Sequence, residues 1–204
     1  IRNWKPSPSA PLWDYAEREE NGPFFENLEL QHILQSGPTC VPTTLAMIAR
    51  STGAEVGPNY FKLRINSQSP HSWSEALEPF GFQLAYCNHD LRRLDYYIDE
   101  LVEYEDLFFL CFYSENPPYD PDSNNKLCMS HIVTLYKDKI IDTAKRGDFG
   151  VSEAKQYPRL NRPTKRIFRV VPTGHSRRVL VVSCSGVMRI YLWRYHSPRP
   201  RIDH

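Results

Sequence analysis

Seven consecutive residues without a charge, Leu107 to Tyr113, form the segment that most constrains the fold of this chain. Acidic residues precede the run, and the polar stretch 114–126, which contains Pro117 and Pro118, follows it. A continuous apolar run of this length is typical of a strand that is buried on both faces. We therefore expect a central strand over residues 107–113, in a sheet that other elements cover.

The predicted helices lie mostly before this strand, and the predicted strands mostly after it. The spacing Ser72-Trp73-Ser74-Glu75 predicts a capping box at the start of one helix. Helices followed by antiparallel strands indicate an α+β domain in which one helix packs on the sheet. The expected helices cover residues 41–52, 58–65, 72–79 and a segment that begins at residue 90, and the expected strands cover 82–87, 107–113, 130–136, 139–143 and 166–171.

The 204 residues, 41% of them apolar, are enough for one buried core. We expect a proline- and aromatic-rich arm over residues 1–23, a globular domain over 24–173 and a basic hairpin or tail over 174–204. The last part carries six arginines against one acidic residue, Asp203. The sequence leaves open whether it is an edge hairpin of the main sheet, an arm that binds an acidic partner or a poorly ordered tail.

The charge and the cysteines limit the partners and the compartment. A net charge of +1 gives no reason to expect binding to nucleic acid or to an anionic membrane. No apolar run approaches the roughly 20 residues of a membrane span. The five cysteines are odd in number and scattered, which indicates a reducing, cytoplasmic compartment. Because the chain begins at Ile1, removal of a leader and secretion stay open. The sequence also leaves the oligomeric state open.

The segment from Gln35 to Cys40 predicts an activated thiol. Cys40 stands where the turn at Gly37-Pro38 passes into an apolar helical pattern. The N-terminus of a helix has unpaired N–H groups and a positive dipole end, which favour the thiolate. Gln35 and the Cys40 backbone N–H are candidate donors to an oxyanion. The alternative is that Cys40 is a buried core residue, as free cysteines often are.

A thiol nucleophile needs a base, and the base needs an orienting group. Of seven histidines, only His131 opens a predicted sheet strand directly after a polar loop. If the next turn is centred on Lys137-Asp138, Asp142 lies opposite Val133 and diagonal to His131 on the same face, about 7 Å away between backbones. A three-residue turn would move Asp142 to the other face and leave Asp148 as the orienting group.

These residues resemble the papain-like cysteine peptidases, and within them the bacteriocin-processing, double-glycine-leader peptidase group. The resemblance rests on Gln35, on Cys40 with the residues that follow it, on His131-Ile132-Val133 and on Asp142, and covers roughly residues 30–150. It implies a papain-like α+β fold with the nucleophile at a helix N-terminus on an antiparallel sheet. It further implies that residues 24–173 are the catalytic domain, with Cys40 as nucleophile, His131 as base, Asp142 as orienting group and Gln35 as oxyanion donor.

The resemblance also implies a peptide or protein substrate and no cofactor. This chain has Val41 where the family usually has glycine, and its interval from His131 to Asp142 is shorter than usual. A transferase or glutamine deamidase of the same fold, or an inactive binding module, stays open. Structural zinc is another alternative, because Cys87, His89, Cys128 and His131 have suitable ligand types, although their spacing is unusual.

Overall fold

The computed structural model describes residues 12–13, 23–87, 92–113, 130–174, 179–182 and 188–191, and of residues 12–13, 87, 179–182 and 188–191 the backbone alone. Most of the predicted N-terminal arm, the predicted loop 114–126 and the end of the C-terminal segment lie outside the described residues.

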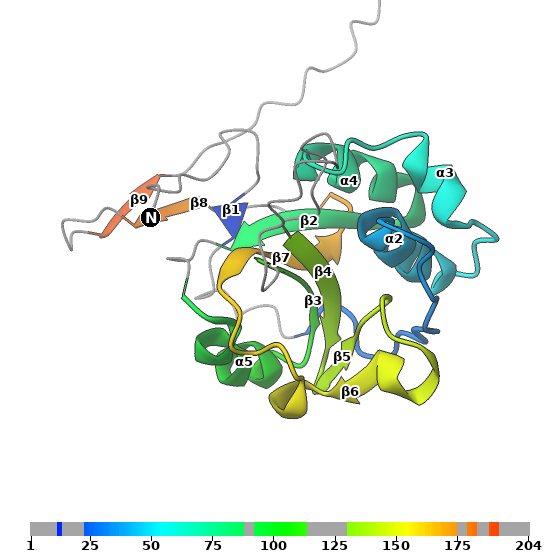
Figure 1. Cartoon of the computed structure of the whole chain (residues 1–204). Coiled ribbons are helices and arrows are strands. Elements are labelled where there is room, and N and C mark those ends of the chain that lie inside the picture. The colour runs from blue at the N-terminus through cyan, green and yellow to red at the C-terminus, as the bar shows by residue number, and fades with distance from the viewer. Residues whose placement is uncertain are drawn as a thin grey trace, which may run out of the picture.

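A seven-stranded sheet forms the centre of the molecule (Figure 1). Its order is β1-β2-β7-β3-β4-β5-β6, and every neighbouring pair is antiparallel except β1 and β2. The predicted central strand, β3, lies between β7 and β4 and is buried along its length as far as Phe112. The strands are β1 (Leu12–Trp13), β2 (Phe82–Cys87), β3 (Leu107–Tyr113), β4 (Ser130–Tyr136), β5 (Lys139–Ile141), β6 (Val151–Glu153) and β7 (Thr164–Pro172).

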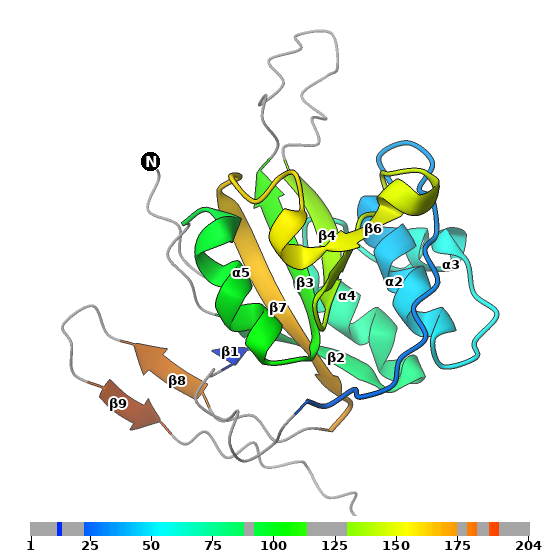
Figure 2. The same ribbon diagram turned by 90° about the horizontal axis from the view of Figure 1, so that it is seen from below.

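Helices cover both faces of this sheet, as Figure 2 shows from below. On one face, α2 packs with α3 and α4 in an apolar cluster that includes Phe109, Phe168 and Val170. On the other face, α5 packs in a second cluster with Phe108, Leu110 and other alternate strand residues. The helices are α2 (Cys40–Arg50), α3 (Pro58–Lys62), α4 (Pro70–Leu77) and α5 (Leu94–Glu103), with short 3-10 turns at Glu78–Phe80, Gly147–Gly150 and Ala154–Gln156.

The α+β prediction is confirmed, and strands β2, β3 and β4 have the predicted limits. The prediction of a capping box at Ser72 is wrong, because α4 already begins at Pro70 after Ser69. Proline fits the first turn of a helix, where its missing N–H would have no partner. The Ser72 hydroxyl instead donates to the Ser69 carbonyl, at 2.7 Å. Helix α5 begins at Leu94, later than the predicted start at residue 90.

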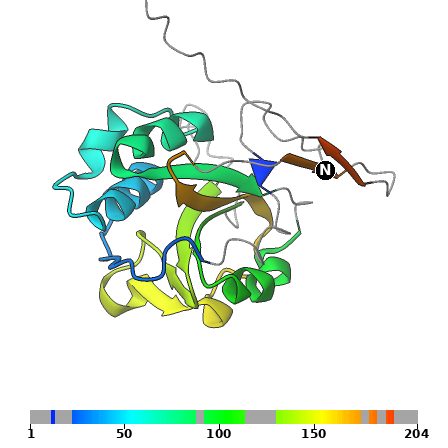
Figure 3. The same cartoon turned by 180° about the vertical axis from the view of Figure 1, so that it is seen from behind.

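An extended segment leads from Pro23 to Thr39 and brings the chain to α2; it is the blue trace that crosses the sheet in Figure 3. The hydroxyl of Tyr136 fixes it by donating to the Phe25 carbonyl at 3.0 Å and accepting from the Leu28 N–H at 2.9 Å. The end of β4 therefore helps to position the approach to Cys40.

Two short strands near the C-terminus, β8 (Val179–Val182) and β9 (Met188–Tyr191), pair with each other as a separate antiparallel sheet. The pairing agrees with the predicted hairpin. The role of this hairpin stays a prediction, as does the division of the chain into an arm (1–23), a globular domain (24–173) and a C-terminal segment (174–204). Across the described residues, no helix is long and apolar enough to cross a membrane.

Candidate active site

Cys40 is the first residue of α2, and a hydrogen-bonded turn precedes it. Gly37 has a φ of +63°, which glycine adopts without strain and which lets the chain reverse before the helix. The Thr39 hydroxyl donates to the Ser36 carbonyl at 2.9 Å, and the Thr43 N–H donates to the Thr39 carbonyl at 3.0 Å. Cys40 is therefore held at the positive end of an 11-residue helix that packs on the sheet.

Gln35 joins this turn to the loop that follows β5. Its backbone N–H donates to the Thr143 carbonyl at 2.8 Å, and its side-chain oxygen accepts from the Thr143 hydroxyl at 3.0 Å. Its amide nitrogen donates to the Gly37 carbonyl at 2.9 Å. An amide nitrogen carries two N–H groups, so one remains after the bond to Gly37. The side chain is half-buried and lies in the turn beside Cys40, outside the wall of the pocket described below.

His131 and Asp142 are hydrogen-bonded, with 2.6 Å between Nε2 and Oδ1. The predicted register of the hairpin is confirmed, since Tyr136 pairs with Lys139 and Thr134 with Ile141 across the turn. Continuing this register by one residue brings Asp142 to the level of Val133, two residues from His131. With Nε2 bonded to Asp142, Nδ1 is the ring nitrogen left to exchange a proton with a thiol.

Asp142 is buried and accepts three hydrogen bonds. Besides His131, the Tyr157 hydroxyl donates to Oδ2 at 2.9 Å and the Ala144 N–H donates to Oδ1 at 3.0 Å. Burial raises the pKa of Asp142. The hydrogen bond and charge of His131, together with the bonds from Ala144 and Tyr157, lower it by more than burial raises it, so the pKa of Asp142 falls to about 2. The carboxylate is therefore ionised at neutral pH and can hold the imidazole in one orientation.

An aromatic ring packs against the imidazole of His131. The Phe112 ring lies edge-on to His131, with 5.6 Å between ring centroids, and the Tyr157 ring lies 6.2 Å from that of Phe112. His131 is only 8% exposed. This packing leaves the ring little room to rotate away from Asp142.

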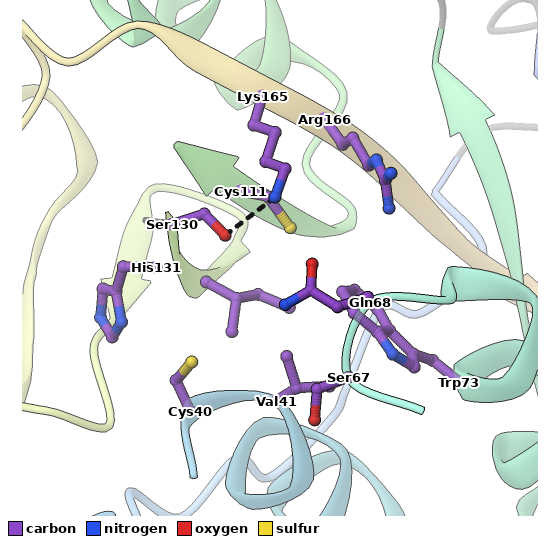
Figure 4. A pocket seen from close by; sticks show the side chains of 11 residues that line it. Cys40, Val41, Ser67, Gln68, Trp73, Cys111, Ser130, His131, Lys165 and Arg166 are labelled. Atoms are coloured by element: carbon purple, nitrogen blue, oxygen red, sulfur yellow. Dashed lines mark hydrogen bonds between the residues drawn. The ribbon is translucent and has the colours of Figure 1, made fainter. Parts of the chain in front are cut away.

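Cys40 and His131 line one pocket, seen from close by in Figure 4. The sulfur of Cys40 and the imidazole lie at the same end of it, and Val41 lies beside Cys40 on the helix. Cys111 from β3 also reaches the pocket, as a buried free thiol. Burial raises the pKa of Cys111 to about 12 despite the lowering effect of Arg166 and Lys165. The pocket thus holds two cysteines in different settings, of which Cys111 stays protonated at neutral pH. The remaining lining residues are Ser67, Gln68, Trp73, Ser130, Ile132, Lys165 and Arg166.

The structure brings Cys40, His131 and Asp142 together and places Gln35 at the edge of the group. Asp148 lies in an exposed turn at Gly147–Gly150, away from this hydrogen-bond network. Sequence reasoning missed Tyr157 and the residues from β7, because no local pattern links residues 157, 165 and 166 to Cys40.

Among the described residues, no group of three or more His, Cys, Asp or Glu side chains could hold a metal ion. Of the proposed zinc ligands, His89, Cys128 and the side chain of Cys87 lie outside the described residues, so the zinc alternative stays a prediction.

Comparisons with known proteins give one structural similarity. No family model and no curated protein matches the sequence. The chain is structurally similar to a protein from Bacillus anthracis that is described as a C39-like peptidase. The sequence identity is 13%, the match covers 69% of this chain and 94% of that chain, and the TM-score is 0.40. The C39-like proteins are the bacteriocin-processing group that the sequence resembles.

Proposed function

We propose that this chain is a cysteine-dependent hydrolase of amide or related acyl bonds, most simply a papain-like peptidase. One observation carries the proposal: the pocket that contains Cys40, at the start of a helix, also contains His131, whose far ring nitrogen is bonded to buried Asp142. A thiol, a base and an orienting carboxylate in this order are the components of nucleophilic catalysis by cysteine.

The reaction follows from these groups. His131 takes the proton of Cys40 through Nδ1, and the sulfur attacks the carbonyl carbon of the substrate. The C–N bond then breaks as the imidazolium gives its proton to the departing amine. Water, deprotonated by His131, attacks the thioester; the C–S bond breaks, an acid is released and the thiol is restored. The second N–H of the Gln35 amide is the proposed side-chain donor to the oxyanion.

The two cysteines of the pocket allow a matched test by intact mass. Purified protein is mixed with a panel of activated acyl esters and peptides, and the mass of a covalent thioester is sought. We expect an acyl adduct that is lost in Cys40→Ala and retained in Cys111→Ser, since Cys111 lines the same pocket but stays protonated. An adduct that survives in Cys40→Ala, or no adduct with any probe, would contradict the proposal.

A second measurement separates hydrolase from transferase and deamidase. If water resolves the thioester, added primary amines leave the products unchanged; a transferase forms an amide with them. A deamidase releases ammonia from glutamine side chains and leaves the peptide bonds intact. Product analysis by mass spectrometry distinguishes the three outcomes.

A further inference from the structure

The end of the pocket away from His131 is positively charged. Lys165 and Arg166, both from β7, line it together with Ser130 and Cys111, and no Asp or Glu is among the described lining residues. Figure 4 shows the two cationic side chains on one wall, with the amide of Gln68 reaching in between them and the Cys40 side. The Lys165 ammonium donates to the Ser130 hydroxyl at 3.2 Å and lies 5.8 Å from the centroid of the Tyr113 ring.

A β-bulge explains how neighbouring residues of one strand enter the same pocket. Cys111 pairs with Arg166, but the next residue, Phe112, pairs with Thr164, so Lys165 is the extra residue of β7. In a regular strand, successive side chains point to opposite faces. A bulge redirects one of them and is common next to active sites.

The two hydrophobic clusters show which side chain the bulge redirects. Phe168 and Val170 pack in the cluster that contains Cys40, whereas Ile167 and Val171 pack in the other. Regular alternation therefore places Arg166 on the Cys40 face and Lys165 on the opposite face. The bulge instead brings Lys165 to Ser130, beside Arg166, and so gives the pocket two cations.

We propose that Lys165 and Arg166 form a carboxylate subsite, which selects substrates with an anionic group close to the acyl group that Cys40 attacks. Guanidinium and ammonium groups bind carboxylates through short, charge-assisted hydrogen bonds, and a partly enclosed site strengthens them. This inference rests on the proposed function for its catalytic meaning. The carboxylate has two possible sources, an Asp or Glu side chain within a peptide or the free C-terminus of a short peptide.

Equilibrium binding to the full chain with Cys40→Ser tests the subsite without any chemistry. Isothermal titration uses N-acetyl-Ala-Ala with a free C-terminus, N-acetyl-Glu-amide and, as neutral reference, N-acetyl-Gln-amide. We expect at least one carboxylate ligand to bind about tenfold more tightly than the neutral one, and the preference to weaken with added salt. The ligand that is preferred identifies the source of the carboxylate.

Substitutions of Lys165 and Arg166 test whether these two residues cause the preference for carboxylate ligands. Lys165→Gln and Arg166→Gln should each remove most of it, while Lys155→Gln, which removes an equal charge from an exposed pair with Asp99, should leave it unchanged. Thermal unfolding of each variant checks that it is folded. Equal binding of all three ligands, no measurable binding of either carboxylate ligand up to about 10 mM, or a preference that survives both substitutions would overturn the subsite.

The two proposals can fail separately. The neutral reagent iodoacetamide, applied to protein with Cys40 intact, reports thiol activation and carries no carboxylate. If Cys40 reacts no faster than Cys111, the catalytic proposal fails whatever the titration shows. If Cys40 reacts rapidly but the titration shows no carboxylate preference, only the subsite is overturned.

Discussion

His131 Nε2 lies 2.6 Å from Asp142 Oδ1 because a two-residue turn at Lys137-Asp138 aligns β4, which carries His131, with β5, which Asp142 directly follows. A turn longer by one residue would move Asp142 to the opposite face of the sheet. Lys137 takes a φ of +54° in this turn, so the tight connection is made without glycine. The geometry of the candidate site is therefore fixed by the hairpin itself.

The Tyr157→Phe variant should alter Asp142 while leaving the packing in place. The phenylalanine keeps the ring against Phe112 but removes the hydroxyl that donates to Oδ2. We expect the pKa of Asp142 to rise and the free energy of unfolding to fall by about 1–3 kcal/mol. NMR titration of the labelled carboxyl carbon measures the first change. An unaltered pKa of Asp142 would show that Tyr157 does not position the carboxylate.

Acid should weaken the fold partly through Asp142. Its pKa in the folded state is about 2, below the ordinary value of 3.8, so the unfolded state binds more protons between these values. The stabilisation is complete above about pH 5 and is lost progressively as the pH falls toward about 2.

The Asp142→Asn variant isolates this contribution. The difference in the free energy of unfolding between the wild type and the variant should be constant from neutral pH to about pH 5 and should shrink below it. Urea denaturation at a series of pH values gives this difference. A gap that stays constant through the acid range would exclude the ionised Asp142 as a source of stability.

A side chain at Gly150 is expected to force the His32 ring to move. A Cβ there would lie 2.5 Å from His32 Nε2, and that nitrogen lies 3.1 Å from the Asp142 carbonyl oxygen. Gly150→Ala should therefore lower the free energy of unfolding by about 1–3 kcal/mol through crowding, and adding His32→Ala should recover part of the loss.

Gly57→Ala is the matched control, because its Cβ would meet no atom closer than 3.9 Å. Chemical denaturation of the wild type, Gly150→Ala, the double variant with His32→Ala and Gly57→Ala gives the four free energies of unfolding. If Gly150→Ala and Gly57→Ala have equal effects, the close packing of His32 on Gly150 does not contribute to the fold.

Arg169 and Asp106 form a fully buried ion pair on the α5 face, with 2.6 Å between Nη2 and Oδ2. Burial raises the pKa of Asp106, although Arg169 lowers it. Arg169→Met would leave the carboxylate buried without this cation and should lower the free energy of unfolding by about 3–5 kcal/mol. Lys155→Met, which breaks an exposed pair, should cost at most about 1 kcal/mol. Similar losses for the two variants would contradict the account of Arg169.

The sequence predicts the parts of this fold that depend on local patterns. Strand β3 is an apolar run between charged residues and a proline-rich stretch, β2 begins directly after Gly81 and β4 ends directly before Lys137, so these limits are predictable. The β4–β5 register follows from one short turn. The start of α4 was mispredicted because Pro70 at the first turn competes with the capping pattern at Ser72.

The rest of the site depends on tertiary structure that no local pattern carries. The position of Tyr157 follows from the path of the chain after β6, and it meets Asp142 from 15 residues away. Lys165 enters the pocket only because a bulge interrupts the alternation of β7. Gln35 was expected beside Cys40, but its bonds to Thr143 and Gly37 become visible only when the loop after β5 is in place.

The rate at which Cys40 is alkylated by iodoacetamide near neutral pH tests the central claim most directly. Peptide mapping by mass spectrometry reports each cysteine separately, and Cys111 serves as the reference in the same pocket. Cys40 should react at least tenfold faster than Cys111, and should slow by about that factor in His131→Ala but not in His71→Ala, whose exposed imidazole pairs with Glu75. Slow labelling of both cysteines, unchanged by His131→Ala, would contradict the claim that Cys40 is an activated nucleophile.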